Sequence, residues 1–303
     1  MVDRGVVFYR WQSVNGQAPF APSDVARQLA DDILRDPAKA LVTGRDTTTA
    51  VSVIDPGGPD RPTRLQVLAV RTEENQPVEW SPGRTVRSLI MSDGHFAADV
   101  THLSIWPDGF AAQDWHAHAP RLGRLAHFLR SQARGHVTFN TLFRPDMMAT
   151  LQRLRGRLRR VEIAITSPEY VDVDRSGVIG ILFPAVYGHR APSLSVNFGM
   201  GRYGPRDRYI DSQTEEAVFN VAENAQDMVD RLVIAGYDPQ VGRVIQVNLL
   251  NQRIARDVSV PPNPEAVTLP DEASIFEEIA NARRDLDDEG LLAGALEAQA
   301  MRR

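Results

Sequence analysis

Arginine is concentrated in the middle of the sequence in a pattern that suits the binding of phosphate. Five arginines fall within the eight residues 153–160. The planar guanidinium group donates two parallel hydrogen bonds, which match a pair of phosphate oxygens. This first group of candidate nucleic-acid-binding residues consists of Arg153, Arg155, Arg157, Arg159 and Arg160.

Two further groups of arginines extend this candidate surface. A glycine-rich loop that begins at Gly199 combines arginines with Tyr203 and Tyr209, and such residues can hold phosphates and stack on sugars or bases. A helix predicted to begin at Pro120 carries arginines on its polar face. The candidate residues are Arg202, Arg206 and Arg208 in the loop, and Arg124, Arg130 and Arg134 on the helix.

The distribution of charge supports a polyanion as the partner more strongly than the total charge does. The net charge is −5, but residues 121–160 contain ten arginines and one acid, Asp146. Residues 271–289 contain eight acids and two arginines. Such asymmetry indicates polyanion binding. Zinc-finger spacing is absent, and we expect sequence-independent contacts to the phosphate backbone.

Composition narrows the class of protein. The chain has 303 residues, of which 43% are hydrophobic and 24% are charged, as in ordinary globular proteins. Cysteine is absent, which excludes disulfides, thiolate catalysis and cysteine-bound metals. The sequence contains no apolar stretch of the length that a membrane span needs, and its start does not resemble an export signal. We therefore expect a cytoplasmic protein.

The elements that must position these residues begin with a sheet-rich block. Its strands are predicted from runs of β-branched and aromatic residues or from alternation, and the segment 55–60 between two of them is a strong turn signal. Apolar residues at helical spacing predict one helix after Ser23 and another from Pro120 to Ala133. The predicted strands are 6–11, 48–54, 65–71, 84–91, 101–106 and 110–115.

The rest of the chain alternates strands and helices. Helices are predicted at 145–155, at 214–235 with Gly236 as the cap, and at 274–300 after the proline linker 261–264. The predicted strands are 136–143, 158–166, 178–187, 193–198 and 244–250.

This order predicts an α+β protein of two domains. A mainly antiparallel sheet domain comprises residues 1–134 plus 270–303. A smaller βαβββαβ domain, residues 135–269, is inserted in it. The C-terminal helix is expected to return to the first domain.

The sequence gives weaker support to an enzymatic function. His116 and His118 would face the same way on a strand and could hold a metal, with His95, His102, His127 or His136 as further ligands. A nuclease of the acid-acid-lysine type would need Lys39, the only lysine, in a strand beside acids. We expect that the protein is not an enzyme and that it uses no cofactor, metal or small-molecule substrate. A metal-dependent nuclease or other hydrolase remains the alternative, and a phage structural or scaffold protein is a third.

The order of elements resembles the RexA-type phage exclusion proteins of prophages. The likeness is carried by the opening strand with Phe8 and Tyr9, the helix segment 125–129 (LAHFL), the strand end 141–144 (TLFR) and the strand 161–165 (VEIAI). This resemblance implies that the protein is a cytoplasmic, two-domain homodimer that binds double-stranded DNA without sequence preference. It also implies that the protein senses an infecting phage and signals to a RexB-like membrane ion channel. Our expectation is an antiviral defence sensor that holds the DNA backbone between its domains.

Overall fold

The computed structural model describes most of the chain, and its sheets and helices make an α+β protein. The strands are β1 (Val2–Ser13), β2 (Leu41–Thr43), β3 (Thr48–Asp55), β4 (Thr63–Val70), β5 (Val78–Glu79), β6 (Arg87–Ser88), β7 (Ala98–Ile105), β8 (Phe110–Trp115), β9 (Val137–Thr141), β10 (Leu158–Thr166), β11 (Ser193–Gly199), β12 (Val229–Asp238), β13 (Arg243–Asn248) and β14 (Ala255–Val260). The helices are α1 (Pro22–Arg35), α2 (Leu122–Ser131), α3 (Pro145–Leu154), α5 (Ser212–Asn224), α6 (Glu272–Asp288) and α7 (Leu291–Ala300), with 3-10 helices at Pro37–Ala40 and Leu249–Gln252. The described residues are 1–13, 22–43, 48–71, 78–79, 87–88, 97–116, 119–120, 122–132, 137–166, 193–200, 208–224, 229–266 and 268–300.

The chain divides into two compact units. Unit 1 comprises 1–7, 11–137 and 256–281, and unit 2 comprises 8–10, 138–255 and 282–303. The predicted domain boundaries differ from this division mainly in two ranges, because residues 256–269 cluster with unit 1 and residues 282–303 cluster with unit 2. Helix α7 packs on α3, where a Cβ added to Gly294 would lie 3.1 Å from the Pro145 side chain.

The main sheet of unit 1 has the strand order β14-β1-β8-β7-β4-β3-β2 among the described residues. Strand β9 also pairs with β1. The pairs β2–β3, β3–β4, β4–β7 and β7–β8 are antiparallel. The β3–β4 pair confirms the hairpin predicted around 55–60. Helix α1 packs on β3 and β4. Its Val25, Leu29 and Ile33 are buried, as the apolar stripe expected there requires, but Leu34, the fourth residue of that predicted stripe, is exposed.

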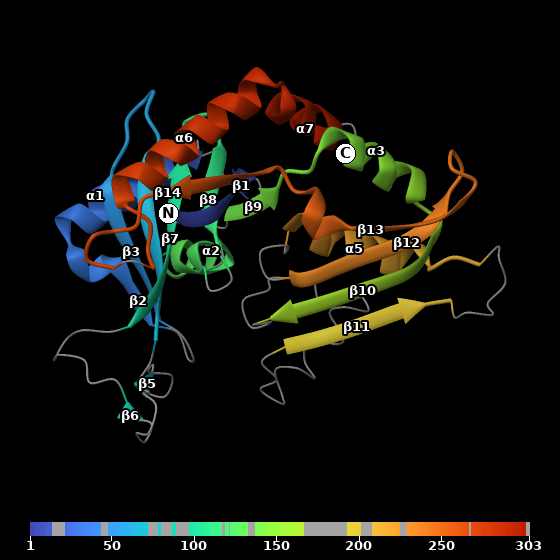
Figure 1. The fold of residues 1–303 in the computed structure, drawn as a ribbon, viewed down its shortest axis with the longest axis horizontal. Coiled ribbons are helices and arrows are strands. Elements are labelled where there is room, and N and C mark those ends of the chain that lie inside the picture. Colours follow the sequence, from blue (N-terminus) through green and yellow to red (C-terminus); the bar gives the residue numbers. More distant parts are fainter. Residues whose placement is uncertain are drawn as a thin grey trace. The chain divides into compact units, whose positions relative to one another are not determined.

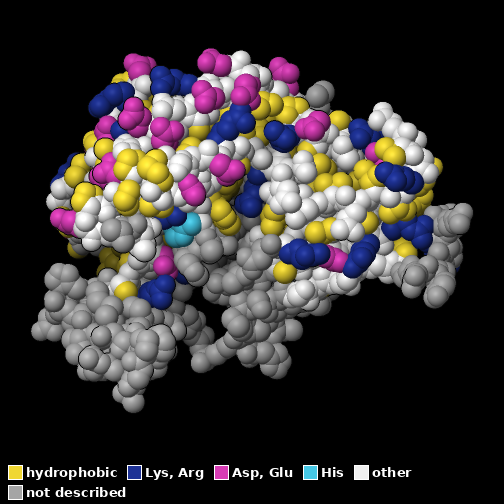
Figure 2. Space-filling view, in the orientation of Figure 1, with side chains coloured by type: hydrophobic (Ala, Val, Ile, Leu, Met, Phe, Trp, Pro, Cys, Tyr) yellow, Lys and Arg dark blue, Asp and Glu magenta, His cyan; other side chains and the backbone are white. Residues whose placement is uncertain are grey.

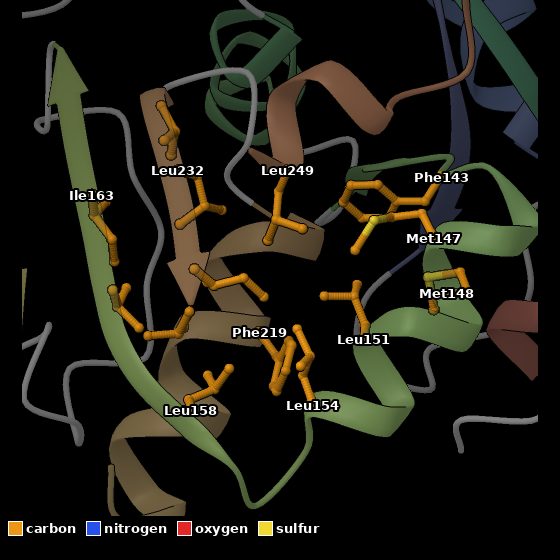
Figure 3. Close-up of a cluster of buried hydrophobic side chains, with 14 of the residues drawn as sticks. Phe143, Met147, Met148, Leu151, Leu154, Leu158, Ile163, Phe219, Leu232 and Leu249 are labelled. Carbon is orange, nitrogen blue, oxygen red and sulfur yellow. The ribbon is translucent and has the colours of Figure 1, made fainter. Parts of the chain in front are cut away.

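Unit 2 contains a second antiparallel sheet with the order β11-β10-β12-β13 (Figure 1). Val161 and Ile163 of β10 alternate with Arg160 and Glu162, so one face of the sheet is apolar. Figure 3 shows the core on this face, where Leu158 and Ile163 of β10 meet Leu232 of β12, Phe219 of α5 and the α3 side chains. The α3 members of the core are Met147, Met148, Leu151 and Leu154.

Two predicted helices are wrong. The apolar stripe assigned to one helix over 214–235 belongs to α5 up to Asn224 and then to strand β12 from Val229. Gly236 consequently lies inside a strand and caps no helix. The predicted final helix is divided at Gly290, whose φ of 70° ends α6 before α7 begins. Strand β14 was not predicted, and the predicted strand 178–187 lies outside the described residues.

Candidate nucleic-acid interface

The turn between α3 and β10 exposes part of the first arginine group. Pro145 occupies the first turn of α3, where its missing N–H is not needed. Gly156 follows the helix with a φ of 71°, a left-handed conformation that glycine adopts without a steric penalty. The Arg157 N–H donates to the Leu154 carbonyl at 2.9 Å, which closes the turn. Arg155 and Arg157, on either side of Gly156, are exposed.

Backbone hydrogen bonds bring two other segments to this turn. Tyr237 N, near the end of β12, donates to the Arg157 carbonyl at 3.1 Å. Ile210 N, which precedes α5, donates to the Leu158 carbonyl at 2.7 Å. Segments that are far apart in the sequence therefore meet at one end of the four-stranded sheet.

Exposed arginines accompany each of these segments. Arg208 lies two residues before Ile210, and Arg243 lies opposite Asp238 in the β12–β13 pair. We call this end of the sheet the basic end and define it by Arg155, Arg157, Arg159, Arg208 and Arg243; all are exposed except Arg159, which is half-buried. Dark blue side chains gather over this part of unit 2 in Figure 2, around the β12–β13 turn.

Arg153 has a structural partner. Its Nε lies 3.1 Å from Oδ2 of Asp238, whose side chain is fully buried. Burial alone would raise the pKa of Asp238, but hydrogen bonds from Gln240 N and from Arg153 lower it below its ordinary value. Removing one partner from such a pair would leave the other charge uncompensated. Arg153 therefore holds the end of β12 on α3.

Carboxylates on α5 also face the turn. Arg155 Nη2 donates to Glu216 Oε2 at 2.9 Å, and this pair is exposed. Both carboxylate oxygens of Glu215 accept from Gly156 N, at 2.8 and 2.9 Å. Burial raises the pKa of Glu215 despite this hydrogen bond and the nearby charge of Arg155. Glu216 thus partly neutralises the charge of Arg155 at the basic end.

A separate charged group occupies the sheet face opposite the core. Glu162 of β10 accepts from Arg160 on its own strand and from Arg231 of β12, the latter through Nε at 2.9 Å. One carboxylate therefore lies between two guanidinium groups, which leaves a single net positive charge.

Sequence reasoning missed Arg231 and Arg243. Arg231 fell in the helix wrongly predicted over 214–235, and Arg243 stands alone in the sequence, outside any arginine-rich run. The turn residues Pro239 and Gly242 between two β-branched runs were an available signal for the hairpin that carries Arg243.

The third predicted arginine group belongs to the other unit. Arg124 and Arg130 lie on α2 in unit 1 and are half-buried, whereas the basic end is part of unit 2. Arg134, Arg202 and Arg206 lie outside the described residues.

The histidines proposed as metal ligands are not brought together in the described part of the chain. Over those residues, no three His, Asp or Glu side chains form a group that could hold a metal ion. His116 lies just after β8 with its Nε2 3.0 Å from the Val100 carbonyl, and His127 is exposed on α2. His102 is buried and pairs with Asp114. His95, His118 and His136 lie outside the described residues.

No helix in the described ranges is both long enough and apolar enough to cross a membrane. Comparison with protein-family models and with curated proteins finds no match to this chain.

Proposed function

We propose that the chain binds double-stranded DNA through its phosphate backbone, without preference for sequence, at the basic end of unit 2. The observation that carries the proposal is the convergence of Arg157, Arg208 and Arg243 on one end of one sheet. Backbone hydrogen bonds from Tyr237 and Ile210 to the α3–β10 turn produce this convergence.

The chemistry of these side chains favours phosphate over base edges. Exposed guanidinium groups make bidentate contacts to phosphate, and such contacts position a protein on DNA without reading its sequence. The proposed phosphate ligands are Arg157, Arg159, Arg208 and Arg243 of the basic end. Arg153 and Arg155 are held by the carboxylates of Asp238 and Glu216. Four phosphate contacts give a log–log dependence of affinity on salt with a slope of about −4.

The biological setting that we propose follows from the resemblance to RexA-type phage exclusion proteins. In this setting a homodimer detects the DNA of an infecting phage and passes the signal to a RexB-like membrane channel. DNA can shift a conformational equilibrium of the protein only by binding one state more tightly than the other. Binding that depends on few base contacts suits a sensor that must respond to phage DNA of any sequence.

Replacing the proposed phosphate ligands tests the site. In the triple variant R157A/R208A/R243A we expect weaker binding to every duplex alike, because each arginine neutralises about one phosphate. The salt slope should fall by about 3, since three ionic contacts are lost. Fluorescence anisotropy with unrelated labelled duplexes, over about 50 to about 200 mM salt, measures both quantities.

The matched control removes the same charge from unit 1. The arginines of R27A/R35A/R61A are at least 40% exposed and form ion pairs with Asp24, Asp32 and Asp55. This variant should retain the wild-type slope. Equal slopes for the two triple variants would contradict the site.

A further inference from the structure

The turn that joins β12 to β13 is firmly built. Residues 239–242 connect the two strands, and Gly242 N donates to the Asp238 carbonyl at 2.8 Å. Gly242 has a φ of 71°, which only glycine adopts easily. Gln240 N donates to Asp238 Oδ1 at 2.8 Å. The buried Asp238 side chain therefore organises the turn from its first position.

The same carboxylate ties the turn to the rest of unit 2. Asp238 Oδ2 accepts from Arg153 Nε at 3.1 Å, and Arg153 in turn donates from Nη2 to Thr150 Oγ1 at 2.9 Å. Thr150 and Arg153 are on α3. The β12–β13 turn projects beyond the end of this helix in Figure 1. A turn held in one conformation loses little conformational entropy when it binds a partner.

Apolar side chains lie exposed on this turn and at the start of β13. Val241 and Val244 are each 50% exposed, and they are two of the few large hydrophobic residues in the described chain that are so exposed. Arg243 lies between them, and Pro239 is also exposed. Single exposed hydrophobic residues are common, but a pair at the tip of a hairpin beside arginines suits contact with a partner that is both apolar and anionic. Figure 2 shows yellow side chains among the dark blue ones in this region.

The groove of duplex DNA has this chemistry. Its rims carry phosphates, deoxyribose rings line its walls, and base edges form its floor. β-Ribbons enter DNA grooves, and minor-groove-binding proteins often insert an apolar wedge at a base step, which bends the duplex.

Taking the proposed DNA-binding function as its basis, we infer that the β12–β13 turn enters the minor groove. Val241 and Val244 contact the groove interior there, while Arg243 and Arg157 hold the flanking phosphates. Arg153 and Asp238 act as positioning residues for the turn.

The double variant V241S/V244S tests this role. We expect affinity for duplex DNA to fall about tenfold, because two apolar side chains lose their buried contacts. The salt slope should stay at the wild-type value, since no phosphate contact is lost. Energy transfer between dyes at the two ends of the duplex should show less bending than with the wild type.

The control is L41S in β2 of unit 1, because Leu41 is also 50% exposed. This variant should bind and bend DNA like the wild type. Thermal unfolding by circular dichroism should give the wild-type midpoint for both variants, because the replaced side chains lie at the surface.

The possible outcomes separate the two proposals. Wild-type binding with a steep salt slope, together with unchanged affinity and bending in V241S/V244S, would overturn the groove contact and leave the proposed function standing. Absence of wild-type binding to any duplex at low salt would overturn both.

Discussion

Asp114 is the centre of a buried polar network in unit 1. Its side chain is 1% exposed, and its Oδ1 accepts from Thr101 Oγ1 at 2.8 Å and from the backbone N–H of His102. Its Oδ2 lies 3.3 Å from His102 Nδ1 and 3.6 Å from Arg4 Nε. Burial alone would raise the pKa of Asp114, but the hydrogen bonds and charge of His102 lower it below its ordinary value.

The network continues from His102 to helix α6. Gln66 Nε2 lies 3.2 Å from His102 Nε2 and donates to Glu272 Oε2 at 2.9 Å. The ring of Phe276 meets the His102 ring edge-on at 5.4 Å between centroids. His102 is thus a structural histidine of the sheet, although the sequence also allowed it as a metal ligand.

We predict that D114N destabilises unit 1 by about 3 kcal/mol at neutral pH, because the largely buried Arg4 loses its counterion and the hydrogen bonds from Thr101 and His102 lose a charged acceptor. The folded-state pKa of Asp114 lies below that of the unfolded chain. Its contribution is therefore complete above about pH 4 and is lost as the pH falls through the folded-state pKa. The wild type should lose stability more steeply than D114N in this acid range.

Tryptophan fluorescence during urea unfolding measures this effect in unit 1. All four tryptophans, Trp11, Trp80, Trp106 and Trp115, fall in the sequence range of that unit. Parallel stability curves for wild type and D114N between about pH 4 and about pH 2 would show that Asp114 is not the group responsible.

At the scale of elements, Gly236 explains how β12 packs so closely on the α3–β10 turn. A Cβ added at this position would lie 2.9 Å from the Arg157 carbonyl oxygen and 3.3 Å from side-chain atoms of Leu154 and Leu158. Because the nearest of these atoms belongs to the backbone, the strand would have to move away. The close approach also allows the hydrogen bond from Tyr237 N to the Arg157 carbonyl.

We expect G236A to destabilise unit 2 by about 1–3 kcal/mol through this overpacking. The control is G199A in β11, whose added Cβ would make only ordinary contacts, the nearest at 3.6 Å from the Arg159 carbonyl oxygen. Thermal unfolding by circular dichroism compares the two variants. Equal midpoints for G236A and G199A would mean that the close approach does not constrain the sheet.

The error at β12 has a physical cause. Val229, Leu232, Val233, Ile234 and Ala235 are all buried, so both faces of this strand are covered. A continuous apolar run lacks the alternation of a half-buried strand, and its residues also fit the helical spacing that continues from Val218. By contrast, β10 shows clear alternation, with Val161 and Ile163 on the core side, and was predicted correctly.

At the scale of the whole molecule, the sequence was sufficient for the α+β class but only partly for the candidate site. The run 153–160 was visible because its arginines are neighbours in the chain. The carboxylate partners of Arg153 and Arg155, namely Asp238 and Glu216, come from β12 and α5, and only the folded chain brings them there. The same long-range pairing adds Arg243 to the basic end.

The most direct test is the binding of the wild-type chain to several unrelated DNA duplexes at increasing salt. We predict equal affinity for all sequences at a given salt concentration, with a log–log slope of about −4. Between about 50 and about 200 mM salt, affinity should therefore fall roughly two-hundredfold. Affinity that depends on sequence and barely responds to salt, or no binding at the lowest salt, would contradict a site made of arginines on phosphates.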